Sequence, residues 1–276
     1  MSAPSAAARL QIGGASLVYQ TIDATGGGSM PFLFQHGMGG DANQPLGYIG
    51  DAPPSPVISL NARGHAPSSD IDPAAATFDT FADDVIALAD QLELARFVVG
   101  GISLGAGTAL NLAIRYPARV TALVLCRPAW LDRPQAEFNR HTYTEIADLL
   151  EGYLPETAAA RYTQTRSYQT VRNISPAAAA SLLGQLTRPR AAQNAVILRA
   201  FPGSSPTASI DSWRAVEVPT LVIGHRGDPF HPYEIAEAHA DTLPSATLHT
   251  VPSKDADPAR FAADIQTALH DFLRQL

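Results

Sequence analysis

The sequence has almost no cysteine, which limits how the chain can be stabilised. Cys126 is the single cysteine among 276 residues, so no disulfide can form within the chain. It follows an apolar run typical of a buried strand, where we expect an inert thiol. A hydrophobic content of 46% is enough for a substantial core, in one large α/β domain or two small ones.

The chain also lacks an excess of positive charge and a long apolar run. Its 19 Lys and Arg residues against 26 Asp and Glu residues give a formal net charge of -7, which argues against a nucleic-acid binder. No apolar run is long enough to span a bilayer, and Met1 to Arg9 lacks the basic start and apolar stretch of a secretory signal. We therefore expect a cytoplasmic globular protein that binds neither nucleic acid nor membrane.

The most informative stretch lies near residue 100. A β-branched run leads into Gly101 to Gly105, which reads Gly-Ile-Ser-Leu-Gly and has the G-x-S-x-G spacing of a nucleophile elbow. The glycines are needed because side chains flanking Ser103 would collide with the neighbouring strand and helix. Residues 106–116 are rich in Ala and Leu and precede Pro117, as in a helix. Such a helix would point its free N–H groups at an oxyanion forming beside Ser103.

A second motif lies upstream. The apolar run Phe32 to Gln35 breaks into His-Gly-Met-Gly-Gly, a loop whose backbone can approach a ligand closely. With both motifs, the sequence resembles the α/β-hydrolase fold family over nearly the whole chain. The resemblance implies an oxyanion hole made of two backbone N–H groups, one from this loop and one from the residue after the nucleophile. On this sequence the two donors would be Met38 and Leu104.

The order of elements predicts the fold class. After a probable edge hairpin within Leu10 to Asp23, strands are expected at residues 31–35, 57–61, 97–100, 120–125, 220–224 and 247–251. Helical patterns separate most of them, including Phe78 to Leu92 with its apolar stripe. This alternation indicates an α/β fold with a mostly parallel, doubly wound sheet, and ligands in such sheets bind beyond the carboxyl ends of the strands.

The alternation of strands and helices stops between Trp130 and Ser212. Residues 135–153, 156–165, 175–186 and 191–201 look helical. The resemblance implies that an insertion after the sixth strand forms a cap, which selects the substrate and excludes water. We expect a core of residues 1–130 and 213–276 and a helical cap of residues 131–212. A solvated helical bundle without catalytic consequence is the alternative.

A nucleophilic serine needs a base and an acid that orients the base, in the chain order serine, acid, histidine. Asp228 follows the apolar run 220–224 in a short loop that resembles the acid-bearing loop of the family. Asp132, which comes after the sixth strand, is the alternative acid. The alternative is that Asp228 is a solvated aspartate in a turn, with no catalytic role.

The expected histidine is missing. The loop before the last helix, Pro252 to Pro258, contains none, and Lys254 or Asp255 occupies its place. Lys254 can serve as base only if its pKa falls by about three units from roughly 10.4, which costs about 4 kcal/mol. Burial under the cap would supply that shift, and Asp228 would oppose it. Lys254 is otherwise a fixed charge for an anionic substrate, or an exposed loop lysine.

Other histidines are weaker candidates for the base. Four have positions that favour structural roles: His65, His231, His249 and His270. His231 in particular precedes Pro232 at a helix start and is expected to end the acid loop. His36 and His225 follow strands at the carboxyl edge, closer to the chemistry. We place His36 at the substrate site, with bracing of the oxyanion loop as the alternative.

Cations and an aromatic residue also emerge at the carboxyl edge. Arg127 and Arg226 each follow a strand, and Arg127 could clamp a substrate carboxylate through two hydrogen bonds. Trp130 could form a wall of the same pocket. As structural alternatives, Arg127 pairs with a carboxylate such as Asp132, and Trp130 joins core and cap.

Together these features predict a hydrolase of a small-molecule ester, lactone or related acyl bond, with Ser103 as nucleophile, Asp228 as acid and Lys254 as the candidate base. A lyase, isomerase or cyclase on the same scaffold and a degenerate binding protein remain alternatives. No cofactor or metal is implied, because clusters of metal ligands at suitable spacing are missing from the sequence. A small molecule, with an anionic one among the options, is the expected partner.

Overall fold

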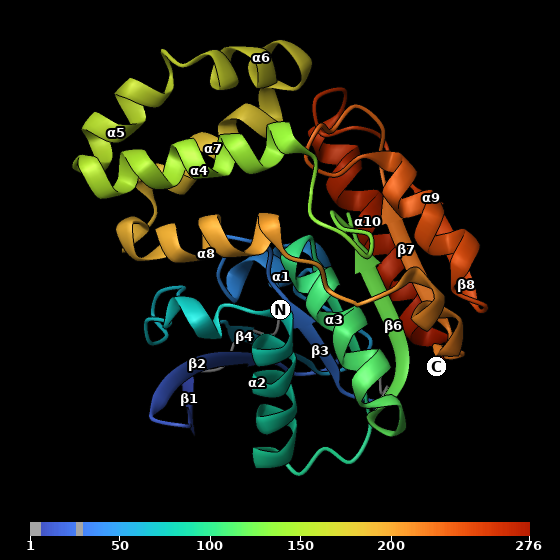
Figure 1. Cartoon of the computed structure of the whole chain (residues 1–276). Helices are drawn as coiled ribbons and strands as arrows, with labels where there is room; N and C mark the ends of the chain where they lie inside the picture. The colour runs from blue at the N-terminus through green and yellow to red at the C-terminus, as the bar shows by residue number, and fades with distance from the viewer. Residues whose placement is uncertain (1–6, 26–29) are drawn as a thin grey trace.

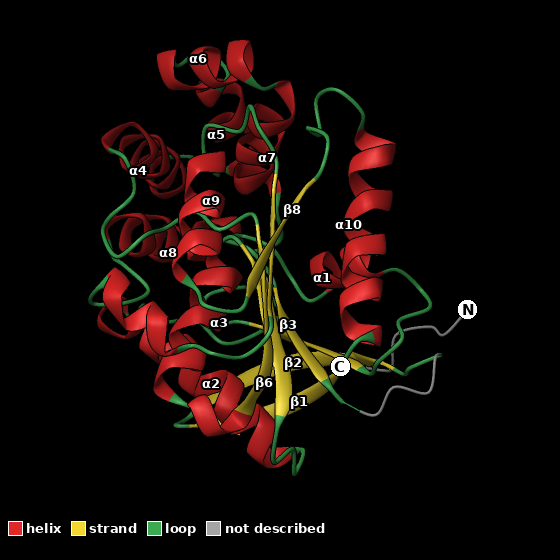
Figure 2. Cartoon of the chain, turned by 90° about the vertical axis from the view of Figure 1, so that its right-hand side faces the viewer, coloured by secondary structure: helices red, strands yellow, loops and turns green. Residues whose placement is uncertain are grey.

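The computed structural model describes residues 7–25 and 30–276, and these form one sheet covered by helices on both faces (Figures 1 and 2). The strands are β1 (Ala8–Ile12), β2 (Ala15–Ile22), β3 (Phe32–Gln35), β4 (Val57–Asn61), β5 (Phe97–Ile102), β6 (Val120–Cys126), β7 (Thr220–Gly224) and β8 (Ala246–Thr250). Their order across the sheet is β1-β2-β4-β3-β5-β6-β7-β8. β2 runs antiparallel to β1 and β4, and every other pairing is parallel.

Helices cover the sheet and its carboxyl edge. They are α1 (Asn43–Ile49), α2 (Phe78–Gln91), α3 (Leu104–Arg115), α4 (Glu137–Gly152), α5 (Pro155–Tyr162), α6 (Arg166–Ile174), α7 (Pro176–Thr187), α8 (Ala195–Ala200), α9 (Tyr233–Thr242) and α10 (Pro258–Arg274). Seen along the sheet, α2, α3 and α9 lie on one face and α1 and α10 on the other (Figure 2).

The central strands are mostly apolar because both faces of the sheet are covered. Along β3, Leu33 points into one core cluster, where it joins Val99 of β5. Phe32 and Phe34 point into the cluster on the opposite face, together with Val98. The side chains alternate between two buried faces, so the strands show no polar side. This rigid sheet positions the loops at its carboxyl edge.

Helices α4 to α8 are inserted between β6 and β7 and lie over the carboxyl edge of the sheet (Figure 1). Their apolar side chains form a third cluster that extends onto the core. Trp130 belongs to this junction: its ring packs edge-on against Phe78 at 5.4 Å between centroids, and its Nε1 donates to the carbonyl of Phe201 at 3.1 Å. Trp130 therefore joins core and insertion rather than forming a wall beside Arg127.

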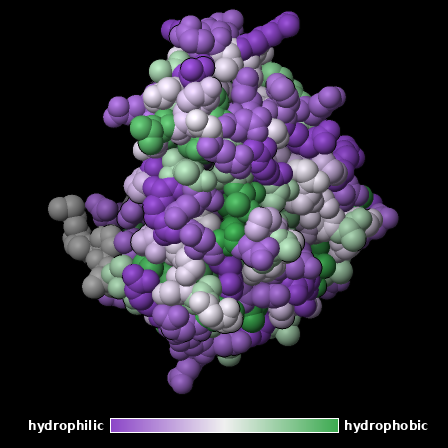
Figure 3. All heavy atoms as spheres, turned by 60° about the vertical axis from the view of Figure 1, so that its left-hand side comes forward, coloured by the Kyte–Doolittle hydropathy of each residue, from purple (hydrophilic) through white to green (hydrophobic). Residues whose placement is uncertain are grey.

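The predicted fold class is confirmed, including the edge hairpin and the parallel strands. Helices α1 and α6 were not predicted. α6 is mostly polar and buries only Ser167 and Val171, too few residues for an apolar stripe. The segment Met1 to Arg9 lies partly outside the described residues. Among the described residues, no helix has the length and apolarity to cross a membrane. The face in Figure 3 is mostly hydrophilic, with small separate hydrophobic patches.

Candidate active site

The four central parallel strands β3, β5, β6 and β7 end side by side, and the residues that follow them meet at one small cavity. Met38, Ser103, Arg127 and Asp228 all line this cavity, whose volume is about 60 Å³. Side chains from α4 and α7 close it from above. The parallel topology thus brings together residues far apart in the chain. We call this space the inner cavity.

Ser103 lies on a tight turn between β5 and α3. Its φ of 55° is in the left-handed region, which is rare for a residue with a side chain and requires support from its surroundings. The adjacent glycines allow the turn, because a Cβ on Gly105 would come within 2.5 Å of the Gln35 carbonyl oxygen. The Ser103 amide donates to the carbonyl of Cys126 at 3.0 Å. The elbow therefore presents the Ser103 side chain to the inner cavity.

Two backbone amides beside Ser103 are unused. In the described part of the chain, neither the Met38 amide nor the Leu104 amide donates a hydrogen bond. Leu104 is the first residue of α3, whose opening N–H groups have no partner within the helix. The dipole of α3 adds a partial positive charge at this end. Both predicted donors are thus available to an anionic oxygen.

Side chains from several segments hold the loop that carries Met38. Gln44 accepts a hydrogen bond from the Gly37 amide at 2.7 Å, and His65 Nε2 accepts one from the Gly39 amide at 3.0 Å. From α7, Gln185 donates to the Met38 carbonyl at 3.1 Å. The loop is therefore tied both to the core and to the inserted helices.

His36 braces this loop and does not line the inner cavity. Its Nδ1 donates to the Gly37 carbonyl at 2.8 Å, and its Nε2 accepts from the Ala62 amide at 3.0 Å. Burial lowers the pKa of His36 to about 4, so the ring is neutral at pH 7. Both nitrogens are occupied by backbone groups, which leaves neither for a substrate.

Asp228 sits in the loop after β7 and accepts four hydrogen bonds. Its Oδ1 accepts from the amides of Phe230 at 2.9 Å and His231 at 3.2 Å, and its Oδ2 accepts from Arg127 and from His231 Nδ1. Burial alone would raise the pKa of Asp228, but His231 and Arg127 together hold it well below its usual value. The carboxylate is therefore ionised at neutral pH.

His231 lines the inner cavity together with Ser103. Its Nδ1 lies 2.8 Å from Asp228 Oδ2 and 3.0 Å from Arg127 Nη2. The ionised carboxylate can only accept and makes the shorter contact, so we assign the proton to Nδ1. In the described structure, Nε2 has no hydrogen-bond partner and keeps its lone pair. Burial, followed by the charge of Arg127, lowers the pKa of His231 below its ordinary 6.5. The ring is therefore a neutral base at pH 7.

Arg127 is paired rather than free. It donates to Asp228 and, at 3.4 Å, to the Tyr48 hydroxyl. Burial disfavours its charge, but Tyr48 and Asp228 more than offset this and raise the pKa of Arg127. It orients the acid and is not available as an unpaired clamp. Arg226, the other predicted cation, is exposed and lies 3.4 Å from Glu237.

The structure does not bring Lys254 to the inner cavity. Lys254 is exposed in the turn after β8. The same turn faces the inserted helices through Asp255, which accepts from the Ala177 amide at 2.7 Å and from the Ser175 hydroxyl. In place of the expected histidine, this loop therefore supplies a contact to the start of α7. Asp132, the alternative acid, accepts from the Ile210 amide at 3.0 Å.

Two features of the site were not recognised in the sequence. The sequence pattern predicts that His231 ends the acid loop, although its spacing of three residues from Asp228 is also compatible with an acid and a base in one turn. Gln185 and Arg188, at the end of α7 and just after it, also line the inner cavity. No local pattern shows which side of α7 faces the core. Among the described residues, no group of three or more His, Cys, Asp or Glu could hold a metal ion.

Comparisons with known proteins agree with this architecture. Residues 30–255 match the family model described as the alpha/beta hydrolase fold. A 2-hydroxymuconate semialdehyde hydrolase from Pseudomonas sp. (strain CF600) is 31% identical over 179 residues, which is 62% of this chain and 59% of that protein. The acetyltransferase component of an acetoin cleaving system from Pseudomonas putida is 32% identical over 124 residues, 45% of this chain and 33% of the relative. The chain thus spans less than two thirds of the length of either curated relative.

Solved structures extend the likeness to nearly the whole chain. The enol-lactonase from Burkholderia xenovorans LB400 superposes with a TM-score of 0.75 at 19% identity, covering 97% of this chain and 100% of that one. A thermophilic esterase from Thermogutta terrifontis gives a TM-score of 0.72 at 24% identity, covering 98% and 99%. At these identities the superpositions show the fold alone. With the family model matching most of its length, the chain belongs to the α/β-hydrolase fold family.

Proposed function

We propose that the protein hydrolyses an ester, lactone or related acyl bond of a small molecule through Ser103. The observation that carries the proposal is the shared inner cavity, which Ser103 lines together with the hydrogen-bonded pair Asp228 and His231. The hydrolase relatives and neighbours support an enzyme of this class. Because Lys254 is exposed and outside the cavity, His231 takes the role of base in this proposal.

In the proposed reaction, His231 Nε2 takes the proton of the Ser103 hydroxyl as Ser103 Oγ attacks the acyl carbon. The carbonyl oxygen becomes an oxyanion and receives hydrogen bonds from the amides of Met38 and Leu104. Asp228 stabilises the imidazolium of His231 through the Nδ1 proton. His231 then gives the proton on Nε2 to the leaving group, and an acyl-enzyme on Ser103 remains.

Water completes the cycle. His231 deprotonates a water molecule as it attacks the acyl-enzyme and forms a second oxyanion. Collapse of this oxyanion breaks the bond to Ser103 Oγ, which takes the proton back from His231, and the acid is released. Arg127 acts as a positioning residue, because it donates to Asp228 Oδ2 and, together with His231, keeps the carboxylate ionised.

A fluorophosphonate probe tests the proposal. We expect covalent labelling at Ser103 with loss of ester turnover, no labelling of Ser103→Ala, and slow labelling of His231→Ala. Turnover that persists in Ser103→Ala would point to non-covalent chemistry such as a lyase or isomerase. A folded protein that neither labels nor turns over any ester would be a binding protein and would contradict the proposal.

A further inference from the structure

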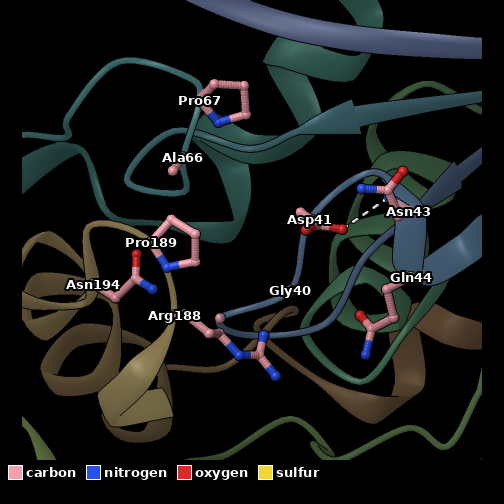
Figure 4. Close-up of a pocket in the computed structure, with 10 residues that line it drawn as sticks. Gly40, Asp41, Asn43, Gln44, Ala66, Pro67, Arg188, Pro189 and Asn194 are labelled. Carbon is pink, nitrogen blue, oxygen red and sulfur yellow. Dashed lines mark hydrogen bonds between the residues drawn. The ribbon is translucent and has the colours of Figure 1, made fainter. Parts of the chain in front are cut away.

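The inner cavity adjoins a much larger pocket, which we call the outer pocket. The outer pocket has a volume of about 600 Å³, against about 60 Å³ for the inner cavity. Gln44 and Arg188 are the residues of the described chain that line both spaces. In Figure 4 they extend into the outer pocket from different elements, Gln44 from α1 and Arg188 from the segment after α7. Arg188 therefore lies at the junction between solvent and Ser103.

Among the described residues, no acidic side chain forms an ion pair with Arg188 at this junction. Arg188 is half-buried, and in the described structure its guanidinium makes no hydrogen bond or ion pair. By contrast, Arg190, two residues further on, is paired with Asp70. Asp41, the acid of the outer pocket, instead accepts from the Asn43 amide at 2.9 Å, as the dashed line in Figure 4 shows. Burial lowers the pKa of Arg188, and Asp41 offsets this only in part.

The other charges of the inner cavity balance one another. Arg127 and Asp228 form an ion pair, and His231 is neutral at pH 7. The charge of Arg188, which Asp41 offsets only in part, therefore faces the cavity that Ser103 lines, in a protein whose net charge is -7. A partly desolvated guanidinium without an acceptor is costly, and a planar carboxylate is the group whose two oxygens match its geometry.

We propose that Arg188 binds a carboxylate on the acyl side of the substrate, so that the preferred substrates are anionic acyl compounds. This inference rests on the proposed function and names its substrate class. The reacting carbonyl occupies the inner cavity at Ser103. The acyl chain passes through the junction, and its terminal carboxylate meets Arg188 at the edge of the outer pocket. A neutral acyl chain of equal length reaches the same place but leaves the guanidinium unpaired.

A matched pair of esters tests this assignment. Mono-4-nitrophenyl adipate and 4-nitrophenyl hexanoate have the same leaving group and acyl length and differ in the terminal carboxylate. For the unmodified protein, we expect kcat/KM to be about tenfold or more higher for the adipate ester. Arg188→Gln should lose this preference, mainly through a higher KM for the adipate ester, so that the two esters are hydrolysed with similar kcat/KM. Arg188→Lys should retain part of the preference.

Arg190→Gln is the control, because it removes the same charge from the same segment but at a residue outside both spaces. It should leave the preference unchanged. Equal rates of the unmodified protein on the two esters, or an equal loss on both in Arg188→Gln, would overturn the inference. Hexanoate turnover and fluorophosphonate labelling of Ser103 report separately on the proposed function. If both are present without a carboxylate preference, the inference about Arg188 fails alone.

Discussion

His231 Nδ1 lies 2.8 Å from Asp228 Oδ2, although the two residues are only three positions apart in one loop. The loop is closed on itself, because Asp228 Oδ1 also accepts hydrogen bonds from the amides of Phe230 and His231. Arg127 donates to Oδ2 from a neighbouring strand end. One short turn thus supplies both an oriented carboxylate and an imidazole whose second nitrogen has no hydrogen-bond partner in the described part of the chain.

The first prediction separates His231 from Lys254 as the base. His231→Gln removes the group that accepts the Ser103 proton, so kcat/KM for an aryl ester should fall by about 10² to 10⁴-fold. Lys254→Met changes an exposed side chain outside the inner cavity and should keep nearly full activity. Steady-state kinetics of the two variants, with circular dichroism to verify folding, gives the answer. The reverse result would restore Lys254 as the base.

The second prediction concerns the pH dependence of the reaction. The base must be unprotonated, so kcat/KM rises as pH increases through the pKa of His231. Burial and Arg127 lower this pKa, which places the rising limb below pH 6.5 and leaves activity flat around pH 7. An initial-rate profile from pH 4 to pH 9 would measure it. A limb that rises only in the alkaline range would indicate a lysine.

The third prediction concerns the elbow glycine Gly105. A Cβ at this position would lie 2.5 Å from the Gln35 carbonyl oxygen and 2.7 Å from that of His36, and neither backbone group can swing away. Gly105→Ala should therefore lower the free energy of unfolding by about 1–3 kcal/mol and displace Ser103, with a marked loss of kcat. Gly152→Ala, where a Cβ meets open space, is the control and should be neutral or slightly stabilising. Urea unfolding and ester turnover of both variants would test this pair.

The fourth prediction links stability to pH through His239. Its ring is buried, stacks on Trp213 with 4.3 Å between centroids, and has a pKa lowered by burial to about 4. Because the folded pKa is below the unfolded value of about 6.5, the neutral ring contributes full stability above pH 6.5 and loses it as pH falls towards 4. At pH 5 the loss amounts to roughly 2 kcal/mol.

His239→Phe keeps the stacking and cannot be protonated. The difference in unfolding free energy between pH 7 and pH 5, measured by urea titration, should therefore shrink by about 2 kcal/mol in this variant. His36 has a similarly lowered pKa and contributes equally in both proteins, so the comparison isolates His239. If the difference between the two pH values were unchanged in the variant, the pKa of His239 would be the same in the folded and the unfolded protein, and the prediction would be wrong.

The local features of the sequence were sufficient for the fold and for part of the site. Apolar strands alternating with helices predicted the sheet, because burial on both faces leaves a short-range pattern. The glycines around Ser103 predicted the elbow, because tight turns restrict which residues can occupy them. The resemblance to the α/β-hydrolase fold family implied the amide donors Met38 and Leu104. Asp228 could be placed because a loop directly after a central strand must emerge at the carboxyl edge.

Tertiary structure alone decided the remaining assignments. Lys254 lies in the expected loop, yet that loop contacts α7 through Asp255 and leaves the lysine exposed. His231 reaches the inner cavity because the turn after Asp228 folds back on itself, and Arg188 reaches it because α7 lies across the sheet edge. These positions depend on the directions of side chains across contacts between distant segments. Periodicity and spacing describe one segment at a time, so they cannot predict how side chains of distant segments point toward one another.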